Sequence, residues 1–232
     1  MGFNVQTFRT RALTAVVFVI VMLTGLWWNV WSFAILFTII HFGCWYEFIS
    51  LVKKINPRSY LPIILSGIFY ISLPVMLMLD LRMNEQQPGW YNTGAPFINM
   101  VIPTGIMFSI WINDTMAYIV GSFIGKTPFS KISPKKTWEG TAGGAVLCVL
   151  VVSLLGWCTG YYQVIDWIAI AAICAVAGTF GDLLESKIKR MANVKDSGSL
   201  MPGHGGFLDR FDSMLVAIPF VWLYVHFFKV NV

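Results

Sequence analysis

Residues 165–186 read IDWIAIAAICAVAGTFGDLLES, and this stretch decides the fold class. It is close to the length of about 20 residues that an α-helix needs to cross a bilayer. Near its end it carries two carboxylates, Asp182 and Glu185, which are three residues apart and therefore share one helical face. Charged groups are costly in a membrane and are usually kept for a task. The stretch therefore predicts a membrane-spanning helix with functional groups at one end.

The rest of the chain has the composition of a membrane protein. Apolar residues make up 57% of it and charged residues only 12%, with a mean hydropathy of +0.70. Seven apolar runs are long enough to span, at 12–28, 30–50, 60–79, 97–125, 141–160, 165–186 and 207–228. We therefore expect an all-α polytopic protein with about seven transmembrane helices, in a single transmembrane domain over residues 1–232.

The first apolar run has two interpretations. It follows Arg9 and Arg11, as the apolar part of a secretory signal would. However, it has no small-residue cleavage site, and it continues through Trp27 and Trp28 into the second run. A retained helical hairpin is therefore the better interpretation.

The cysteines indicate no metal site. All four lie inside apolar runs, without metal-ligand spacing, at Cys44, Cys148, Cys158 and Cys174. We expect them to be buried thiols.

Basic residues mark one side of the membrane. With seven spans and an internal N-terminus, 14 of the 16 Lys and Arg residues fall inside, and only Arg82 and Lys229 fall outside. The positive-inside rule then places both charged loops in the cytosol. The net charge of +5 lies in short loops between apolar runs, so anionic lipid and nucleotide phosphates are better partners than nucleic acid.

This orientation predicts that several carboxylates meet at one depth. Asp114 and Asp182 each lie about 26 Å along helices that enter from outside. Asp209 and Asp212 lie about 3–8 Å into the last helix, which enters from inside. We therefore expect four carboxylates from three helices near the cytosolic face. The alternative, in which each acid pairs with a Lys or Arg only to stabilise packing, stays open.

Two charged segments are expected beside these carboxylates. Residues 186–212, hereafter the signature segment, read SKIKRMANVKDSGSLMPGHGGFLDRFD, and their basic residues and glycines suit phosphate groups. Residues 113–140 read NDTMAYIVGSFIGKTPFSKISPKKTWEG. This segment places lysines and hydroxyl groups at the start of a predicted helix, and the N-terminus of a helix is a favourable site for anions. Gly121 and Gly125 in this segment are spaced for close helix contact. A basic loop alone is usually topogenic, but opposite an acidic cluster the functional interpretation is favoured.

Together these residues resemble the signature of the phosphatidate cytidylyltransferases, or CDP-diacylglycerol synthases. The matching positions are Ser186, Lys189-Arg190, Lys195-Asp196, His204-Gly205-Gly206 and Asp209-Arg210-Phe211-Asp212, with Asn113-Asp114, Ser133-Pro134-Lys135-Lys136 and Gly181-Asp182 upstream. The resemblance is strong from about residue 110 and only general before it. It therefore divides the chain into N-terminal helices, 1–109, and a catalytic half, 110–232.

The resemblance implies that CTP and phosphatidate react to give CDP-diacylglycerol and pyrophosphate for phospholipid biosynthesis. It also implies a divalent cation, and carboxylates with phosphates and water suit Mg²⁺, while a second cation is left open. The implied catalytic residues are Asp182, Asp209, Lys189 and Arg190. The implied substrate-binding residues are Lys135, Lys136, Lys195, His204, Ser133 and Asn113. The implied metal ligands are Asp182 and Asp209, with Asp212, Asp114 and Asp196 as further candidates.

The expected partners are CTP, phosphatidate and membrane lipids, without nucleic acid, and a homodimer is left open. The expected location is the bacterial inner (cytoplasmic) membrane, with the active site facing the cytosol.

Two other classes are considered: a CTP-dependent kinase of polyprenol-type lipids, and a transporter or channel with intramembrane carboxylates. The acids cluster at one face and the two halves show no repeat, so a transporter is disfavoured. No nucleophile–base arrangement is evident, so we expect direct attack by a phosphatidate oxygen.

Overall fold

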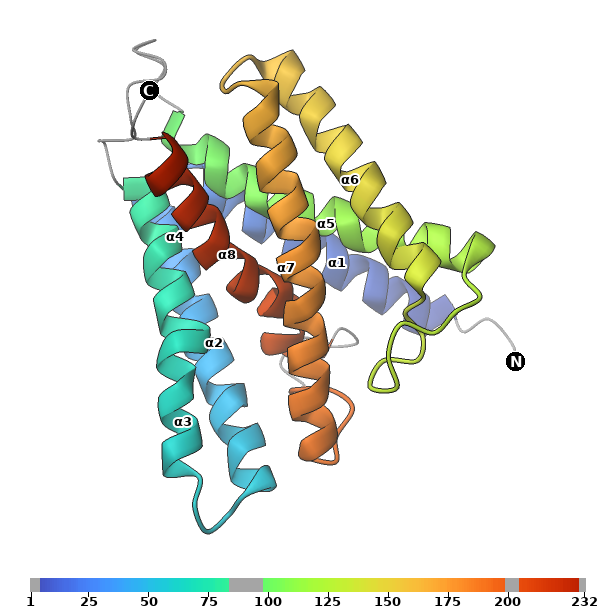
Figure 1. Cartoon of the computed structure of the whole chain (residues 1–232). Coiled ribbons are helices and arrows are strands. Elements are labelled where there is room, and N and C mark those ends of the chain that lie inside the picture. Colours follow the sequence, from blue (N-terminus) through green and yellow to red (C-terminus); the bar gives the residue numbers. More distant parts are fainter. Residues whose placement is uncertain (1–4, 84–97, 199–204, 230–232) are drawn as a thin grey trace. The chain divides into compact units, whose positions relative to one another are not determined.

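The computed structural model describes residues 5–83, 98–198 and 205–229. Within these ranges the regular elements are helices, and an isolated β-bridge joins Pro128 and Thr137. The elements are α1 (Val5–Trp27), α2 (Val30–Ile55), α3 (Leu61–Gly67), the π-helix η1 (Ile68–Ser72), α4 (Leu73–Met83), α5 (Ile98–Ile124), α6 (Trp138–Thr159), α7 (Val164–Met191) and α8 (Leu208–Lys229) (Figure 1). Apart from residues at its edges, each predicted apolar run is helical where it is described, and the third is built from α3, η1 and α4 in succession.

Five helical stretches of the described chain are long and apolar enough to cross a membrane. They are Val30–Ile55, Leu61–Met83, Trp138–Thr159, Val164–Met191 and Leu208–Phe228. The chain is therefore a membrane protein. The apolar part of α1, Ala12–Trp27, is shorter, and α5 carries the polar pair Asn113-Asp114 among its apolar residues. A count of seven spans consequently stays a prediction.

Among the helix ends that differ from the prediction, two have local electrostatic and capping reasons. α7 continues to Met191, so Lys189 and Arg190 lie in its last turn, where positive charge interacts favourably with the helix dipole. α6 begins three residues earlier than predicted, because the Thr137 hydroxyl accepts a hydrogen bond from Gly140 N (3.1 Å) and caps the helix.

The chain forms two compact units. The first comprises residues 1–75 and 187–211, and the second comprises residues 76–186 and 212–232. Both α7 and α8 therefore contribute residues to each unit. The functional division at residue 110 stays a prediction.

In the first unit α1 and α2 form the expected hairpin. Asn29 accepts a hydrogen bond from Ser32 N (2.7 Å), and Ser32 Oγ accepts one from Asn29 N (3.0 Å), which makes a reciprocal cap at the start of α2. A Cβ on Gly25 would lie 2.5 Å from the Leu36 side chain, so the two helices are in close contact. On its other side α2 runs beside α3 (Figure 1).

In the second unit α5 and α6 approach each other at small residues. A Cβ on Gly140 would lie 2.8 Å from Ala117 O, and one on Gly144 would lie 2.7 Å from Ala117 N. Gly121 lies opposite Gly140, since its Cβ would be 3.5 Å from Gly140 Cα. The predicted close helix contact at Gly121 is therefore confirmed, and this kind of contact is typical of membrane helices.

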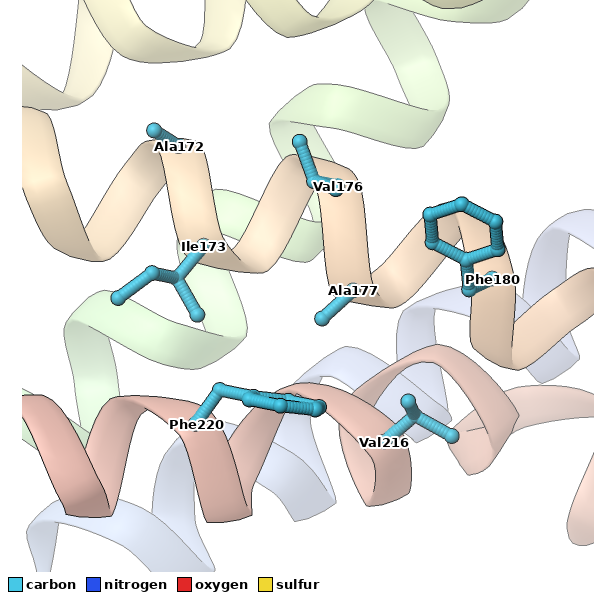
Figure 2. A pocket seen from close by; sticks show the side chains of 7 residues that line it. All are labelled: Ala172, Ile173, Val176, Ala177, Phe180, Val216 and Phe220. Carbon is cyan, nitrogen blue, oxygen red and sulfur yellow. The ribbon is translucent and has the colours of Figure 1, made fainter.

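α7 and α8 of the same unit touch through their backbones. A Cβ on Gly181 would lie 2.5 Å from Asp212 O and 2.9 Å from Ser213 Cα. Next to this contact an apolar groove of about 570 Å³ lies between the two helices (Figure 2). Its walls are formed by Ala172, Ile173, Val176, Ala177, Phe180, Val216 and Phe220. In a bilayer such a groove is suited to hydrocarbon rather than to water.

Three of the four cysteines are buried, as predicted: Cys44, Cys148 and Cys174. The prediction is wrong for Cys158, which is exposed. At this end of α6 it is Gly156 that faces the Trp167 ring, and Trp157 on the other side is exposed as well. Cys158 therefore lies on a face of α6 that points away from the contact with Trp167.

Candidate active site

Three carboxylates of the second unit form a group suited to a metal ion. Asp182 and Glu185 extend from α7 and Asp212 from α8, and one oxygen of each lies within 4.8 Å of the others. The backbone contact at Gly181 brings these helices together at this point. Glu185 is 0% exposed and Asp212 is 6% exposed, so the group is largely shielded from solvent. Asp182 and Asp212 were predicted as ligands, whereas Glu185 was placed only on the face of Asp182.

Lys136 lies among these charges. Lys136 forms an ion pair with Asp182, and it directly precedes the cap of α6. Burial lowers the pKa of Lys136 from its ordinary value, while the charges of Asp114 and Asp212 raise it. Carboxylates of α5, α7 and α8 thus act on one ammonium group, whereas Asp209, the fourth carboxylate that the depth argument places at this level, belongs to the first unit. Their role as metal ligands stays a prediction.

Hydrogen bonds join the two ends of the loop that carries Lys136. Glu139, in the first turn of α6, accepts hydrogen bonds from Thr127 N (3.1 Å) and Thr127 Oγ1 (2.8 Å). Within the loop, Phe129 N donates to Lys136 O (2.8 Å), and Trp138 N donates to Thr127 O (3.0 Å). Both ends of the loop are therefore held by hydrogen bonds, and the backbone at Lys136 is one of the bonded groups.

Asp209 is the centre of a second polar group, in the first unit. Its Oδ1 pairs with Lys189 Nζ at the end of α7 (2.5 Å). Its Oδ2 accepts hydrogen bonds from Ser197 N and Gly206 N (2.9 Å each). Gly205 has a φ of +81°, which favours glycine, and a Cβ there would lie 2.7 Å from Asp209 Oδ2. Asp209 thus connects α7 to two parts of the signature segment.

The other predicted residues differ in exposure. Those that are exposed are Lys135, Arg190, Lys195 and Asp196, together with Asp114. Asn113 is buried on α5, and Ser133 is partly buried in the loop before α6. His204 lies outside the described residues. The assignment of these side chains to CTP or phosphatidate stays a prediction.

Glu47 contacts the signature segment but was not predicted. It lies on α2, is 1% exposed, and accepts hydrogen bonds from Phe207 N (3.0 Å), Leu208 N (2.9 Å) and Ser197 Oγ (2.7 Å). The sequence did contain a signal, because a carboxylate inside the apolar run 30–50 is costly unless it has partners. Its partner, however, lies 160 residues further along the chain.

The family model described as the cytidylyltransferase family matches residues 89–228. The chain belongs to the cytidylyltransferase family. The match includes α5 to α8 and hence all the carboxylates predicted as metal ligands. Glu47 lies outside the matched residues, so its contact with the signature segment is not part of what the family match covers.

Several curated relatives carry a more specific name. Phosphatidate cytidylyltransferase 4, chloroplastic, of Arabidopsis thaliana is 39% identical over 180 residues, which cover 71% of this chain and 46% of the relative. The phosphatidate cytidylyltransferase of Synechocystis sp. is 42% identical over 130 residues, or 53% and 44% of the two chains. That of Bacillus subtilis is 42% identical over 122 residues, or 52% and 45%. In each of these matches the chain spans somewhat less than half the length of the relative.

Proposed function

We propose that this chain transfers the cytidylyl group of CTP to phosphatidate, giving CDP-diacylglycerol and pyrophosphate. The observation that carries the proposal is the group of Asp182, Glu185 and Asp212 beside Lys136, at the ends of apolar helices. Carboxylates for a cation and a lysine for phosphate, placed within a membrane protein, fit a water-soluble nucleotide and a lipid phosphate. Family membership and the names of the relatives support the same reaction.

The proposal includes Mg²⁺ as cofactor. The three carboxylates are close enough to share one ion, and Mg²⁺ prefers oxygen ligands of this kind. Asp182, Glu185 and Asp212 would hold it, and Asp209, Asp114 and Asp196, which the resemblance also implies, are further candidates. When bound, the ion supplies charge neutralisation for the reacting phosphates. A second cation stays a prediction.

The chain's own residues position the two substrates. Lys136 would neutralise phosphate charge beside Asp182, and Lys189 and Arg190 would do so at the end of α7. A phosphatidate oxygen then forms a bond to the α-phosphorus of CTP, while the bond from that phosphorus to the pyrophosphate oxygen breaks. Positioning and charge neutralisation carry most of such a transfer, and no covalent enzyme intermediate is needed.

The fate of the phosphates of CTP tests the reaction. Purified chain in detergent with phosphatidate and Mg²⁺ is expected to move label from [α-³²P]CTP into lipid and to leave the γ-label in pyrophosphate, because the bond to the α-phosphorus is the one formed. Thin-layer chromatography separates the products. Transfer of the γ-label to a lipid would instead identify a kinase, and no transfer of either label would refute the proposed function.

We further propose that both charged loops face the cytosol, on the basis of the distribution of basic residues. In a Cys158→Ser background, Ser130→Cys and Ser199→Cys are expected to react with an impermeant maleimide only after permeabilisation. Gln163→Cys, in the turn between α6 and α7, is the matched control and should react in intact cells. The reverse pattern would invert the orientation. The bacterial cytoplasmic membrane and a homodimer stay predictions.

A further inference from the structure

We propose that Glu47 is a positioning residue, through which α2 fixes the first turn of α8 and hence Asp209. The importance of Asp209 for turnover rests on the proposed function, whereas the contact between Glu47 and the signature segment does not. All the residues concerned belong to the first unit.

The start of α8 needs a capping group that its own sequence does not supply. The first N–H groups of a helix have no partner within the helix, and a Ser, Thr, Asp or Asn at the cap position usually accepts from them. Here the residue before Leu208 is Phe207, which has no side-chain acceptor. Glu47 takes this role from another helix, since its two oxygens accept from Phe207 N and Leu208 N. A carboxylate there also interacts favourably with the helix dipole.

The apolar side of the same turn is held by α2 as well. A Cβ on Gly43, one turn before Glu47, would lie 2.7 Å from the Phe207 ring. The ring therefore packs directly against the backbone of α2. One hydrogen-bonding contact and one packing contact thus fix the direction in which α8 begins.

At two glycines of the signature segment, the Glu47 carboxylate occupies the space that a side chain would need. A Cβ on Gly198 would overlap with Glu47 Oε1, and a Cβ on Gly206 would overlap with Glu47 Oε2. Neither glycine has the left-handed conformation that Gly205 has, so backbone conformation does not account for them. Their lack of a side chain is instead explained by the close approach of the Glu47 carboxylate.

Ser197 links Glu47 to Asp209 directly. Its Oγ lies 2.7 Å from Glu47 Oε2 and 3.0 Å from Asp209 Oδ2. A hydroxyl group has one proton to donate, so the two carboxylates share it. Both backbone groups that meet Glu47 are also donors. A Gln side chain would turn an NH₂ group towards one of these donors, which explains why the site requires a carboxylate.

The test compares Glu47→Gln with Ser72→Ala. Ser72 is the matched control, because its hydroxyl is hydrogen-bonded to His41 (2.9 Å) and Trp45 (2.9 Å) of α2, the helix that carries Glu47, and not to any residue in the described part of the signature segment. Glu47→Gln is expected to lower kcat by about 100-fold, the effect of a displacement of about 1 Å at a reacting group. We expect KM for CTP to change by less than about threefold, because the loss concerns the transition state. Glu47→Asp, which keeps the carboxylate with a shorter reach, should recover part of kcat.

Hydrogen exchange provides a readout that does not depend on the reaction. In Glu47→Gln the amides of Gly206, Phe207 and Leu208 should exchange about tenfold faster than in the original chain, whereas Ser72→Ala should leave them unchanged. Unchanged exchange would refute the proposed contact. Faster exchange with kcat lowered no more than in Ser72→Ala would show that the contact does not position Asp209. If the unsubstituted chain shows no cytidylyl transfer, that result refutes the proposed function but not the contact between Glu47 and the signature segment.

Discussion

An Asp182→Asn variant is expected to lose turnover by about 10³-fold, because several kcal/mol of charge stabilisation by the bound cation would be lost. The same change should cost little stability in the absence of Mg²⁺. Asp182 shares its site with Glu185 and Asp212, so removing one negative charge relieves repulsion while it weakens the pair with Lys136. Turnover is measured with labelled CTP, and stability by thermal unfolding in detergent.

The dependence on Mg²⁺ separates this role from a purely structural one. In the original chain Mg²⁺ at a hundred times its Kd should add about 2.7 kcal/mol of stability, and in Asp182→Asn most of this gain should disappear. Asp80→Asn is the control, since Asp80 accepts a hydrogen bond from Trp222 (2.7 Å) and is not in the carboxylate group. We expect that variant to retain both turnover and the Mg²⁺ effect. Near-normal turnover with lowered stability in Asp182→Asn would assign the residue to packing.

Asp209→Asn is expected to lose turnover too, but to differ in stability. Asp209 accepts from Ser197 N and Gly206 N and pairs with Lys189, so the amide that replaces its carboxylate would meet donors. Its loss should therefore lower unfolding stability, by about 1–3 kcal/mol. The two aspartates are thus distinguished by whether stability falls with activity.

A Gly181→Ala variant is expected to lose about 1–3 kcal/mol of stability and about 100-fold in turnover. Its new Cβ would lie 2.5 Å from Asp212 O and 2.9 Å from Ser213 Cα. Both are backbone atoms, so the clash is relieved only by moving α8 and with it Asp212. Thermal unfolding and the CTP assay measure the two effects on one preparation.

Gly178→Ala is the matched control, one turn earlier on α7 and opposite the same helix. Its Cβ would meet Ser213 Cβ at 3.4 Å, which is an ordinary contact. Alanine is also a better helix former than glycine by about 1 kcal/mol, so this variant should be as stable as the original chain or more stable. Equal behaviour of the two variants would show that the contact at Gly181 does not hold Asp182 beside Asp212.

The helices were largely predictable from the sequence, because apolar length and polar ends are local properties. Asp182 and Asp212 were also expected near each other, since counting residues along a helix fixes depth. Glu185 was not predicted as a member of the carboxylate group. Its spacing from Asp182 shows only a shared face, whereas its burial depends on the approach of α8 to Gly181, which is a tertiary contact.

The role of Glu47 lay beyond local rules for a related reason. Capping is normally recognised from a residue next to the helix it caps, and here the cap comes from α2. The glycines of the signature segment suggested only a place where phosphate can approach the backbone, since nothing local shows that a distant carboxylate fills the space beside Gly198 and Gly206. Cys158 is the opposite case, because an apolar neighbourhood in sequence does not reveal which face of a helix lies against another.

The tie between Glu139 and Thr127 bears on how tightly a phosphate can be held. Fixing the backbone of one free residue costs about 1–2 kcal/mol in conformational entropy. When a loop becomes ordered only on binding its ligand, this cost reduces the binding free energy. The loop before α6 is already fastened at both ends, with Lys136 O hydrogen-bonded to Phe129 N. In the proposed reaction little of this entropy would remain to be lost when a nucleotide binds, so less of the attraction between Lys136 and a phosphate would be offset by ordering of the loop.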